Sequence, residues 1–591
     1  MKVSFIISLI IILLITIIYF LFLRKKKSIK TNIFVAIITC IIAISILIFP
    51  LLDYDNLYTR SFASFVYATK CIGMGQNLDI LSRINLETTF GYLYFILINF
   101  LFLILPSLTV GFILSYLEKI IAYIKLKIFH NKKICIFSEI NDKSLKIAKN
   151  LKNNCTIIFT GDFSKTDISV KSIILNKKIT DIKINPKSNV NFYMISQNEE
   201  KNLNDTLELI AKYKKRDNTK IYVINKSKET PTILDSTDNG KIDVEIVNET
   251  ERAIFNLLNN KPLFLNTVNN TISILIVGCG NIGTEFLKDS IWCGMLPNYK
   301  LEVLVVDKNA DIIKDKLNVE MPELLSNYDI TFVNGDIKSN KVMNIIKKRS
   351  NINYVLVSME TDDKNIDTAI MLRRLFIKEF DRNPVINLNI QNEYKQKQVL
   401  GLSNEKGQSY DLNAFGSLND LYSHNNIIDS DLEKLAIQVH LSYDPEDKNL
   451  YRYNLREYNK RSSRACALHI KYKIYSVLGD KFTKDMKENQ KLFKEIYSSE
   501  IEELLAKNEH NRWNAYMRSI GYVFVSTNDV AKYYKKTNHY IHYLAKMHPA
   551  ITEYDKLDDI SKELSNITSK KINLKDSDRC IVKSIYDKIN L

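Results

Sequence analysis

The sequence predicts a multidomain protein with N-terminal transmembrane helices, two tandem α/β domains and a mainly α-helical C-terminal domain. Long apolar runs are concentrated in the first 120 residues. Buried strand patterns then alternate with helical patterns, which is typical of parallel βαβ units. Such a chain is long enough for several domains. We expect a membrane region at 1–130, α/β domains at 131–265 and 271–440, and a helical domain at 450–591.

Three apolar runs, at about 4–23, 33–52 and 91–117, are long enough to cross ~30 Å of hydrocarbon as helices. The first lacks a small-residue cleavage site, which disfavours a signal peptide. Basic residues follow the first run and the third. By the positive-inside rule, we expect a multi-pass plasma-membrane protein in contact with lipid, with its N-terminus outside and residues after about 118 in the cytoplasm.

The segment between the second and third runs allows two interpretations. Its stretch from Phe65 to Gly75 resembles a potassium-channel filter, in which backbone carbonyls replace the water around an ion. Lys70 and Gln76 depart from that pattern, and the alternative is an amphipathic external loop. On the first interpretation, the candidate pore residues are Thr69, Cys71, Ile72, Gly73, Met74 and Gly75.

A glycine-rich turn follows the buried strand pattern that begins at Ser273. It opens a helical pattern, and a second buried strand then ends at Asp307. Such a turn lets backbone approach a phosphate at a helix N-terminus, and the acid suits ribose hydroxyls. The candidate contacts to NAD(H) or an adenine nucleotide are Gly278, Gly280, Asn281, Ile282, Gly283 and Asp307. The alternative is that the glycines serve only helix packing and Asp307 only ends a strand.

An internal repeat indicates that the α/β domain occurs twice. Residues 191–205 and 353–367 share a strand, a serine, a polar loop and the start of a helix. Two such copies predict tandem Rossmann-like domains. Ser138 stands in the first copy where a glycine turn would be. We therefore expect only the second copy to bind a nucleotide.

Residues 272–390 resemble an RCK domain, the TrkA-N type of regulator of potassium conductance. The matching features are the turn at 278–283, Asp307, the turn ending at Asp336, and the polar segment 361–365. The resemblance implies that the glycine turn, Asp307 and Asp336 surround a nucleotide. It also implies a homo-oligomer, because RCK domains pair and form rings, with the first copy as an assembly partner.

The C-terminal part resembles the bacterial form of the ryanodine-receptor repeat (RyR) domain. The matching order is a Glu-His-x-Arg-Trp helix from Glu509, then Gly521-Tyr522, His548-Pro549 and Tyr554-Asp555. The resemblance implies a ligand-sensing module in a nucleotide-signal effector, in some bacteria a phage-defence protein. Its candidate ligand residues are Glu509, His510, Arg512, Trp513 and Tyr516.

For this domain we expect an anionic ligand, because Arg512 on the helix forms a basic cluster with four later residues, Lys532, Lys535, Lys536 and His539. The alternative is that Trp513 and Tyr516 are core residues and that Glu509 and Arg512 form a structural ion pair.

Charge and motif content narrow the function. The net charge is +16, but zinc-finger spacing and nucleic-acid motifs are absent, so we expect no nucleic-acid partner. The eight cysteines form no CxxC pair, and no catalytic constellation is legible, so we predict no structural metal and no catalysis. We expect a membrane-anchored, ligand-gated ion channel or membrane-permeabilising effector. The alternatives are a membrane-tethered NAD-dependent oxidoreductase and a non-conducting nucleotide-sensing scaffold.

Overall fold

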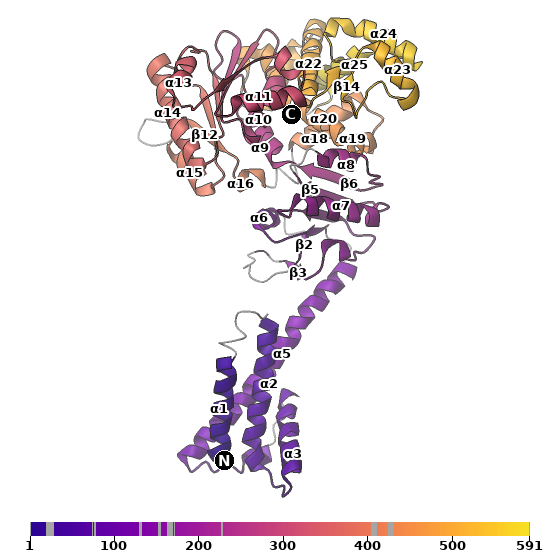
Figure 1. The fold of residues 1–591 in the computed structure, drawn as a ribbon. Helices are drawn as coiled ribbons and strands as arrows, with labels where there is room; N and C mark the ends of the chain where they lie inside the picture. The colour runs from indigo at the N-terminus through magenta and orange to yellow at the C-terminus, as the bar shows by residue number, and fades with distance from the viewer. Residues whose placement is uncertain are drawn as a thin grey trace. The chain divides into compact units, whose positions relative to one another are not determined.

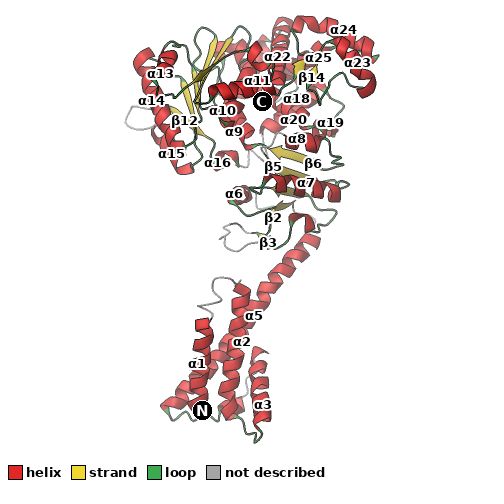
Figure 2. Cartoon of the chain, viewed as in Figure 1, coloured by secondary structure: helices red, strands yellow, loops and turns green. Residues whose placement is uncertain are grey.

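The computed structural model describes residues 2–18, 29–73, 75, 78–128, 133–151, 155–161, 170, 172–225, 229–402, 410–422 and 431–589. The chain divides into two compact units, Met1–Lys133 with Ile158–Asn189, and Ile134–Ile157 with Val190–Leu591. Helices dominate the N-terminal residues, and two large sheets lie in the rest of the chain (Figures 1 and 2).

The described N-terminal residues form α1 (Lys2–Ile18), α2 (Ile29–Ile48), α3 (Leu57–Lys70), α4 (Leu78–Leu81) and α5 (Thr89–Ile128). By length and composition, the segments Ile33–Leu51 and Thr89–Leu114 could cross a membrane. They coincide with the second and third apolar runs. The described part of the first run contains only a shorter apolar stretch, Lys2–Leu13. Residues 19–28, which include most of the first basic segment (24–30), lie outside the described residues.

Both apolar and polar side chains join α2 to its neighbours. Ala43 and Ile44 of α2 are fully buried. The hydroxyls of Ser45 and Ser64 lie 3.2 Å apart and join α2 to α3. The Tyr94 hydroxyl of α5 donates to the carbonyl of Leu47. Polar contacts of this kind suit helices in an apolar environment, where the hydrophobic effect does little to hold them together.

The first large sheet has the strand order β3-β2-β1-β4-β5-β6. Its strands are β1 (Lys133–Phe137), β2 (Cys155–Thr160), β3 (Ile173–Leu175), β4 (Val190–Met194), β5 (Thr219–Ile224) and β6 (Asp243–Val247). The pairs β2–β3, β1–β4, β4–β5 and β5–β6 are parallel. The accompanying helices are α6 (Asp142–Asn150), α7 (Glu199–Tyr213), α8 (Glu229–Asp235) and α9 (Glu249–Asn260).

The second large sheet repeats this order as β9-β8-β7-β10-β11-β12, and all five pairs are parallel. Its strands are β7 (Thr271–Val277), β8 (Lys300–Asp307), β9 (Asp329–Asn334), β10 (Tyr354–Val357), β11 (Val385–Asn389) and β12 (Leu412–Phe415). Its main helices are α10 (Asn281–Cys293), α11 (Ala310–Glu320), α13 (Asn340–Lys347), α14 (Asp362–Phe380), α15 (Glu393–Leu402) and α16 (Leu418–Leu421). Numbered within each domain, both sheets have the Rossmann order 3-2-1-4-5-6. The prediction of tandem Rossmann-like sheets is confirmed.

The C-terminal region is mainly helical, as predicted. Its helices are α18 (Asp431–Tyr443), α19 (Tyr451–Leu455), α20 (Glu457–Leu478), α21 (Met486–Ile496), α22 (Ser499–Ser519), α23 (Thr527–Thr537), α24 (Leu557–Thr568) and α25 (Leu574–Asp587). Two short strands, β13 (Val523–Phe524) and β14 (Met547–His548), pair in parallel.

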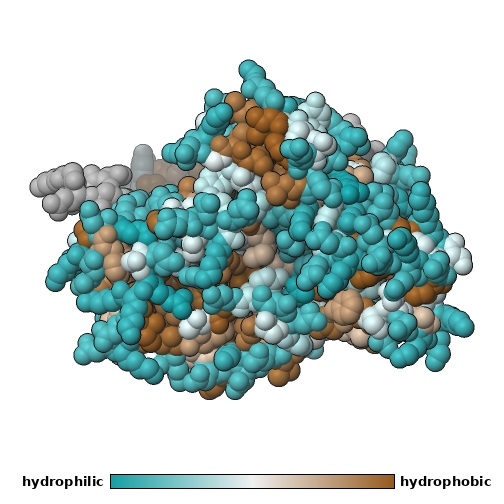
Figure 3. Space-filling model, turned by 90° about the horizontal axis from the view of Figure 1, so that it is seen from above, coloured by the Kyte–Doolittle hydropathy of each residue, from teal (hydrophilic) through white to brown (hydrophobic). Residues whose placement is uncertain are grey.

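The C-terminal helices complete the hydrophobic core of the second sheet. Tyr516 and Ile551 belong to the same buried cluster as Trp292 and Leu356. The rings of Trp292 in α10 and Tyr516 in α22 meet edge to face, with centroids 6.2 Å apart. A second buried cluster consists of C-terminal residues alone. The face shown in Figure 3 is largely hydrophilic, and its hydrophobic side chains gather in small patches.

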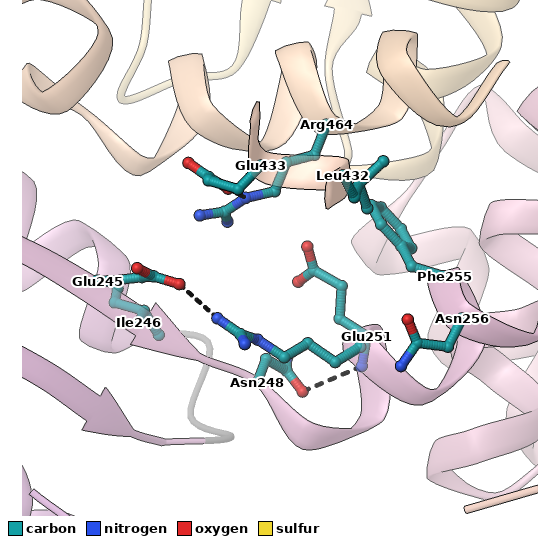
Figure 4. Close-up of a pocket in the computed structure, with 10 residues that line it drawn as sticks. Glu245, Ile246, Asn248, Glu251, Phe255, Asn256, Leu432, Glu433 and Arg464 are labelled. Carbon is teal, nitrogen blue, oxygen red and sulfur yellow. Dashed lines mark hydrogen bonds and ion pairs between the residues drawn. The ribbon is translucent and has the colours of Figure 1, made fainter. Parts of the chain in front are cut away.

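Buried charged side chains gather where the first sheet meets the C-terminal helices (Figure 4), and Lys460 of α20 pairs with Asp243 of β6 across that boundary at 3.0 Å. Arg252 of α9 pairs with Glu245 of β6 at 2.5 Å. Arg464 of α20 bonds Glu433 of α18 at 2.6 Å. The cavity that these side chains line has a volume of about 40 Å³. A space of that size holds roughly one ordered water, as is common where buried polar groups meet.

Candidate functional site

A cavity of about 640 Å³ opens at the carboxyl ends of the second sheet's strands. It lies where the strand order reverses, between β7 and β10, which is the usual ligand position in an open parallel sheet. The walls come from the turn after β7, the ends of β8 to β11 and the start of α11. Of the predicted residues, Gly278, Gly280, Asn281, Ile282, Asp307 and Asp336 line this cavity.

The three glycines of the turn have different roles. Gly278 has a φ of +85°, and a Cβ there would lie 2.6 Å from the Ser358 carbonyl oxygen. A Cβ on Gly283 would lie 2.2 Å from the carbonyl oxygen of Gly278. Both glycines are therefore required by the turn itself. A Cβ on Gly280 would meet no atom within 4 Å, so this position faces open space beside the N-terminus of α10.

Asp307 fastens the glycine turn to β8. One carboxylate oxygen accepts from the Cys279 N–H at 2.7 Å, and the other from the Asn309 N–H at 2.8 Å. A carboxylate oxygen can accept a second hydrogen bond, so ribose hydroxyls remain possible donors. Sequence reasoning missed this turn-holding role, because the spacing of the motif does not show which amide the acid contacts.

Asp336 lies at the rim and forms an ion pair with Lys308 at 3.1 Å. A hydrogen bond from the Lys338 N–H, and then the Lys308 ammonium, hold the pKa of Asp336 below its usual value. Lys308, Ile312 and Glu360 line the same cavity and were not predicted. In the sequence, Lys308 directly follows the second strand of the motif, and no other signal marks these three residues.

The corresponding region of the first sheet holds stacked aromatic rings. Phe137 and Tyr193 stack with centroids 4.6 Å apart, and Tyr193 and Tyr222 stack at 4.9 Å. Ser138 accepts a hydrogen bond from the Ile195 N–H at 2.9 Å. The cavity lined by Tyr193, Tyr222 and Tyr422 has only about 10 Å³. That volume is too small for a nucleotide.

A second ligand-sized cavity, of about 320 Å³, lies among α18, α20, α22, α25 and the segment around 540–550. Glu509, His510, Arg512 and Trp513 line it, whereas Tyr516 lies in the core shared with α10. Lys532, Lys535, Lys536 and His539 are exposed and are not among its lining residues. The structure thus does not bring together the predicted basic cluster: Arg512 is 1% exposed and pairs with Glu509 at 2.8 Å.

Long-range packing adds residues that the sequence did not single out. Asp578 of α25 lies 3.2 Å from His510 Nδ1, and Lys473 of α20 lies 2.6 Å from Glu509. Burial raises the pKa of Asp578, and the hydrogen bond with His510 opposes that shift. Burial raises the pKa of Glu509, but the Arg512 and Lys473 cations outweigh burial and bring it well below its usual value. Glu509 is therefore ionised at neutral pH.

The predicted pore residues lie at the end of α3. Thr69 donates to the Val66 carbonyl, and Cys71 is buried with its thiol against the Tyr67 carbonyl. Ile72 and Gly73 belong to a short 3₁₀ turn, and the Gly75 N–H donates to the Lys70 carbonyl at 3.3 Å. Met74 lies outside the described residues.

His440, Asp444 and Asp447 form a group whose ligand atoms lie close enough to hold a metal ion. His440 Nε2 lies 2.8 Å from Asp447, and Arg452 pairs with Asp444 at 2.5 Å. These side chains are already partnered within the protein. The absence of a metal remains a prediction.

Comparison with known proteins adds little beyond this geometry. No family model matches the chain, and no curated protein matches it significantly. Among solved structures, GsuK bound to ADP is 14% identical and covers 68% of this chain and 98% of its own, with a TM-score of 0.33. A dipicolinate synthase chain from Bacillus halodurans is 9% identical and covers 50% and 94%, with a TM-score of 0.21. These similarities are too low to establish the fold, which rests on the strand order.

Proposed function

We propose that this chain is a membrane-anchored protein whose second Rossmann-like domain binds an adenine nucleotide or NAD(H) and thereby controls the conductance of its membrane region. One observation carries the proposal. The cavity of about 640 Å³ at the point of strand-order reversal is lined by a glycine turn, a helix N-terminus and an acid at the end of β8. These are the parts that a dinucleotide-binding site needs.

The chemistry of the lining residues favours such a ligand. The first N–H groups of α10 have no acceptors within the helix and carry partial positive charge, which suits a phosphate placed over Gly280. Asp307 suits ribose hydroxyls, and Ile312 and Ile313 of α11 offer an apolar wall for a base. Lys308 and Asp336 at the rim contribute charges of both signs.

The membrane region supports a conducting function. Between the two membrane-length segments, α3 ends at a short glycine-containing turn, an arrangement that resembles a pore helix followed by a filter. We propose that several copies assemble around this turn, with the N-terminus outside and the two sheets in the cytoplasm. Tyr58, Phe62 and Phe65 of α3 are exposed at three- and four-residue steps, which offers an apolar face to lipid or to neighbouring copies.

Control by a ligand requires unequal affinity for two states of the protein. We propose that the nucleotide prefers one arrangement of the cytoplasmic domains and that α5 transmits this preference. The RyR-like C-terminal domain provides a second input, in a bacterial signalling or defence pathway.

The first experiment tests the site. The full-length protein, purified in detergent, should carry a nucleotide that mass spectrometry identifies after denaturation. Gly280→Asp should abolish nucleotide binding in calorimetry, because a carboxylate would enter the phosphate position. Gly401→Asp is the matched control, since a Cβ on Gly401 also meets no atom within 4 Å. Equal affinity in the wild type and Gly280→Asp would refute this site.

The second experiment tests the consequence of binding. Ion flux from vesicles that contain the protein should change when the identified nucleotide is added, and should not change with Gly280→Asp. Binding without any flux would favour the non-conducting scaffold. Turnover of NAD(H) with a co-substrate would favour the oxidoreductase.

A further inference from the structure

The C-terminal cavity has walls suited to a planar ring. It is separate from the nucleotide cleft and measures about 320 Å³. Five large aromatic side chains line it: Tyr443, Tyr458, Trp513, Tyr540 and Tyr543. They come from three helices and one loop, so the site forms only in the folded chain. A cavity of this size with mixed aromatic and polar walls is typical of a small-molecule site.

The rings are held in fixed orientations by edge-to-face contacts. Trp513 meets His548 with centroids 4.9 Å apart and an interplanar angle of 74°. Tyr540 meets the same imidazole at 6.0 Å and 89°. Tyr458 and Tyr543 meet at 5.9 Å and 81°. Rigid aromatic walls favour a flat π-system, which gains about 1–3 kcal/mol when it stacks on such a ring.

His548 presents an unused hydrogen-bond donor in this cavity. Its side chain is largely buried, with the residue 5% exposed, and Nδ1 accepts from the Ala550 N–H at 3.1 Å. We therefore assign the proton to Nε2. Among the described residues, Nε2 has no hydrogen-bond partner, although the residue lines the cavity. Burial, together with the nearby His510, lowers the pKa of His548 to about 3, so the ring is neutral at physiological pH.

The charged groups in the wall do not favour a charged ligand. The ionised groups there include the Glu509 carboxylate and the Arg512 guanidinium, and the wall also holds the side chains of Asp578 and His510. Glu509 is bonded to Arg512 and Lys473, and Asp578 to His510. A phosphate would find no excess positive charge among the described lining residues, and an organic cation would find both carboxylates already paired.

We propose that this cavity is a second binding site, which takes a neutral planar heteroaromatic group such as the base of a nucleoside. The ring stacks against Trp513 and the tyrosines, and a ring nitrogen or carbonyl accepts from His548 Nε2. The proposal does not depend on the function of the glycine cleft, and its test is made with that cleft blocked.

Trp513 supplies the readout, because it is one of only two tryptophans and the other, Trp292, is fully buried in the shared core. The full-length Gly280→Asp protein in detergent is titrated with adenosine, and tryptophan fluorescence is recorded. We expect saturable quenching, which Trp513→Phe should remove. AMP should bind no more tightly than adenosine.

Two variants locate the ligand. His548→Phe removes the donor and keeps a ring, and should weaken adenosine binding about tenfold, the value of one hydrogen bond. Ser462→Leu places a larger side chain in the wall from a partly exposed position of α20, and should abolish binding even if His548→Phe folds poorly. Ser499→Leu, on the exposed start of α22, is the matched control and should bind normally.

Several results would overturn the proposal. One is the absence of quenching by adenosine, guanosine and cytidine at concentrations on the order of millimolar, a practical limit for weak binding. Another is a strong preference for AMP that Lys535→Ala removes, which would indicate an anion site on α23. Choline that competes as well as adenosine would indicate a cation site instead.

Discussion

The two Rossmann-like sheets have the same strand order, but the carboxyl ends of the strands are filled with side chains in the first sheet and border an open cavity in the second. The second has a glycine turn and a cavity of about 640 Å³, whereas the first has three stacked aromatic rings and a cavity of about 10 Å³. The last two strands of the first sheet are joined by buried ion pairs around Glu245. In the second sheet, the neutral amides of Asn387 and Asn413 join the corresponding strands. Topology alone therefore does not define a binding site; the side chains at the strand ends do.

The largest expected effect comes from the aromatic stack of the first sheet. Tyr193→Ala should destabilise the protein by about 3–5 kcal/mol, because it leaves a cavity between Phe137 and Tyr222. Thermal unfolding followed by circular dichroism should show an earlier first transition, with nucleotide binding kept by the second sheet. Tyr193→Phe keeps the ring and should behave nearly as the wild type. If Tyr193→Ala instead gained nucleotide binding, filling by the aromatic rings alone would account for the difference between the two sheets, and a glycine turn would not be needed.

Gly283→Val tests the glycine turn and should cost about 3 kcal/mol, since its Cβ would meet the backbone oxygen of Gly278 at 2.2 Å. Nucleotide affinity should fall together with the melting temperature. Gly280→Ala faces open space and should melt as the wild type does. A Gly283→Val protein of unchanged stability would show that the turn can relax.

Acid should weaken the first sheet more than the second. Burial raises the pKa of Glu245, but ion pairs with Lys220 and Arg252 bring it down to about 2. A depressed carboxyl pKa stabilises the fold above the unfolded value of about 4.5, and this contribution is lost as pH falls towards 2. The loss should reach about 1.4 kcal/mol per pH unit in that window.

Glu245→Gln is the matched variant for that measurement. Its stability should vary less between pH 4.5 and pH 2 than that of the wild type, as urea unfolding at several pH values would show. Parallel pH profiles for the two proteins would contradict the assignment.

The smallest effect concerns Asp307. Asp307→Asn keeps the shape and retains one acceptor, but removes the charge opposite the ribose. Nucleotide affinity measured by calorimetry should fall roughly tenfold, or about 1.4 kcal/mol. Asp311→Asn, on the neighbouring helix, is the control and should bind normally. Unchanged affinity for Asp307→Asn would limit the role of Asp307 to holding the Cys279 and Asn309 N–H groups.

The sequence predicted the helices and strands well because their patterns depend on residues that are close together in the chain. Repeated strand and helix periodicity predicted both parallel sheets, and the glycine turn predicted where one of them opens. The stack of Phe137, Tyr193 and Tyr222 was not predictable, because its rings come from three strands whose register the sequence does not reveal. The C-terminal cavity was only half predicted for the same reason: Trp513 lies on the recognised helix, whereas Asp578 and His548 arrive from distant segments.

The shared core of α10 and α22 has a consequence for biosynthesis. Trp292 leaves the ribosome long before Tyr516, whose ring packs against it, and before Ile551 of the same buried cluster. Since chains generally fold from the N-terminus during synthesis, the second sheet must wait with an uncovered apolar face until nearly the whole polypeptide has emerged. Premature termination in the last hundred or so codons should therefore yield a folded N-terminal region that carries an aggregation-prone, chaperone-bound domain, and cells should degrade such products.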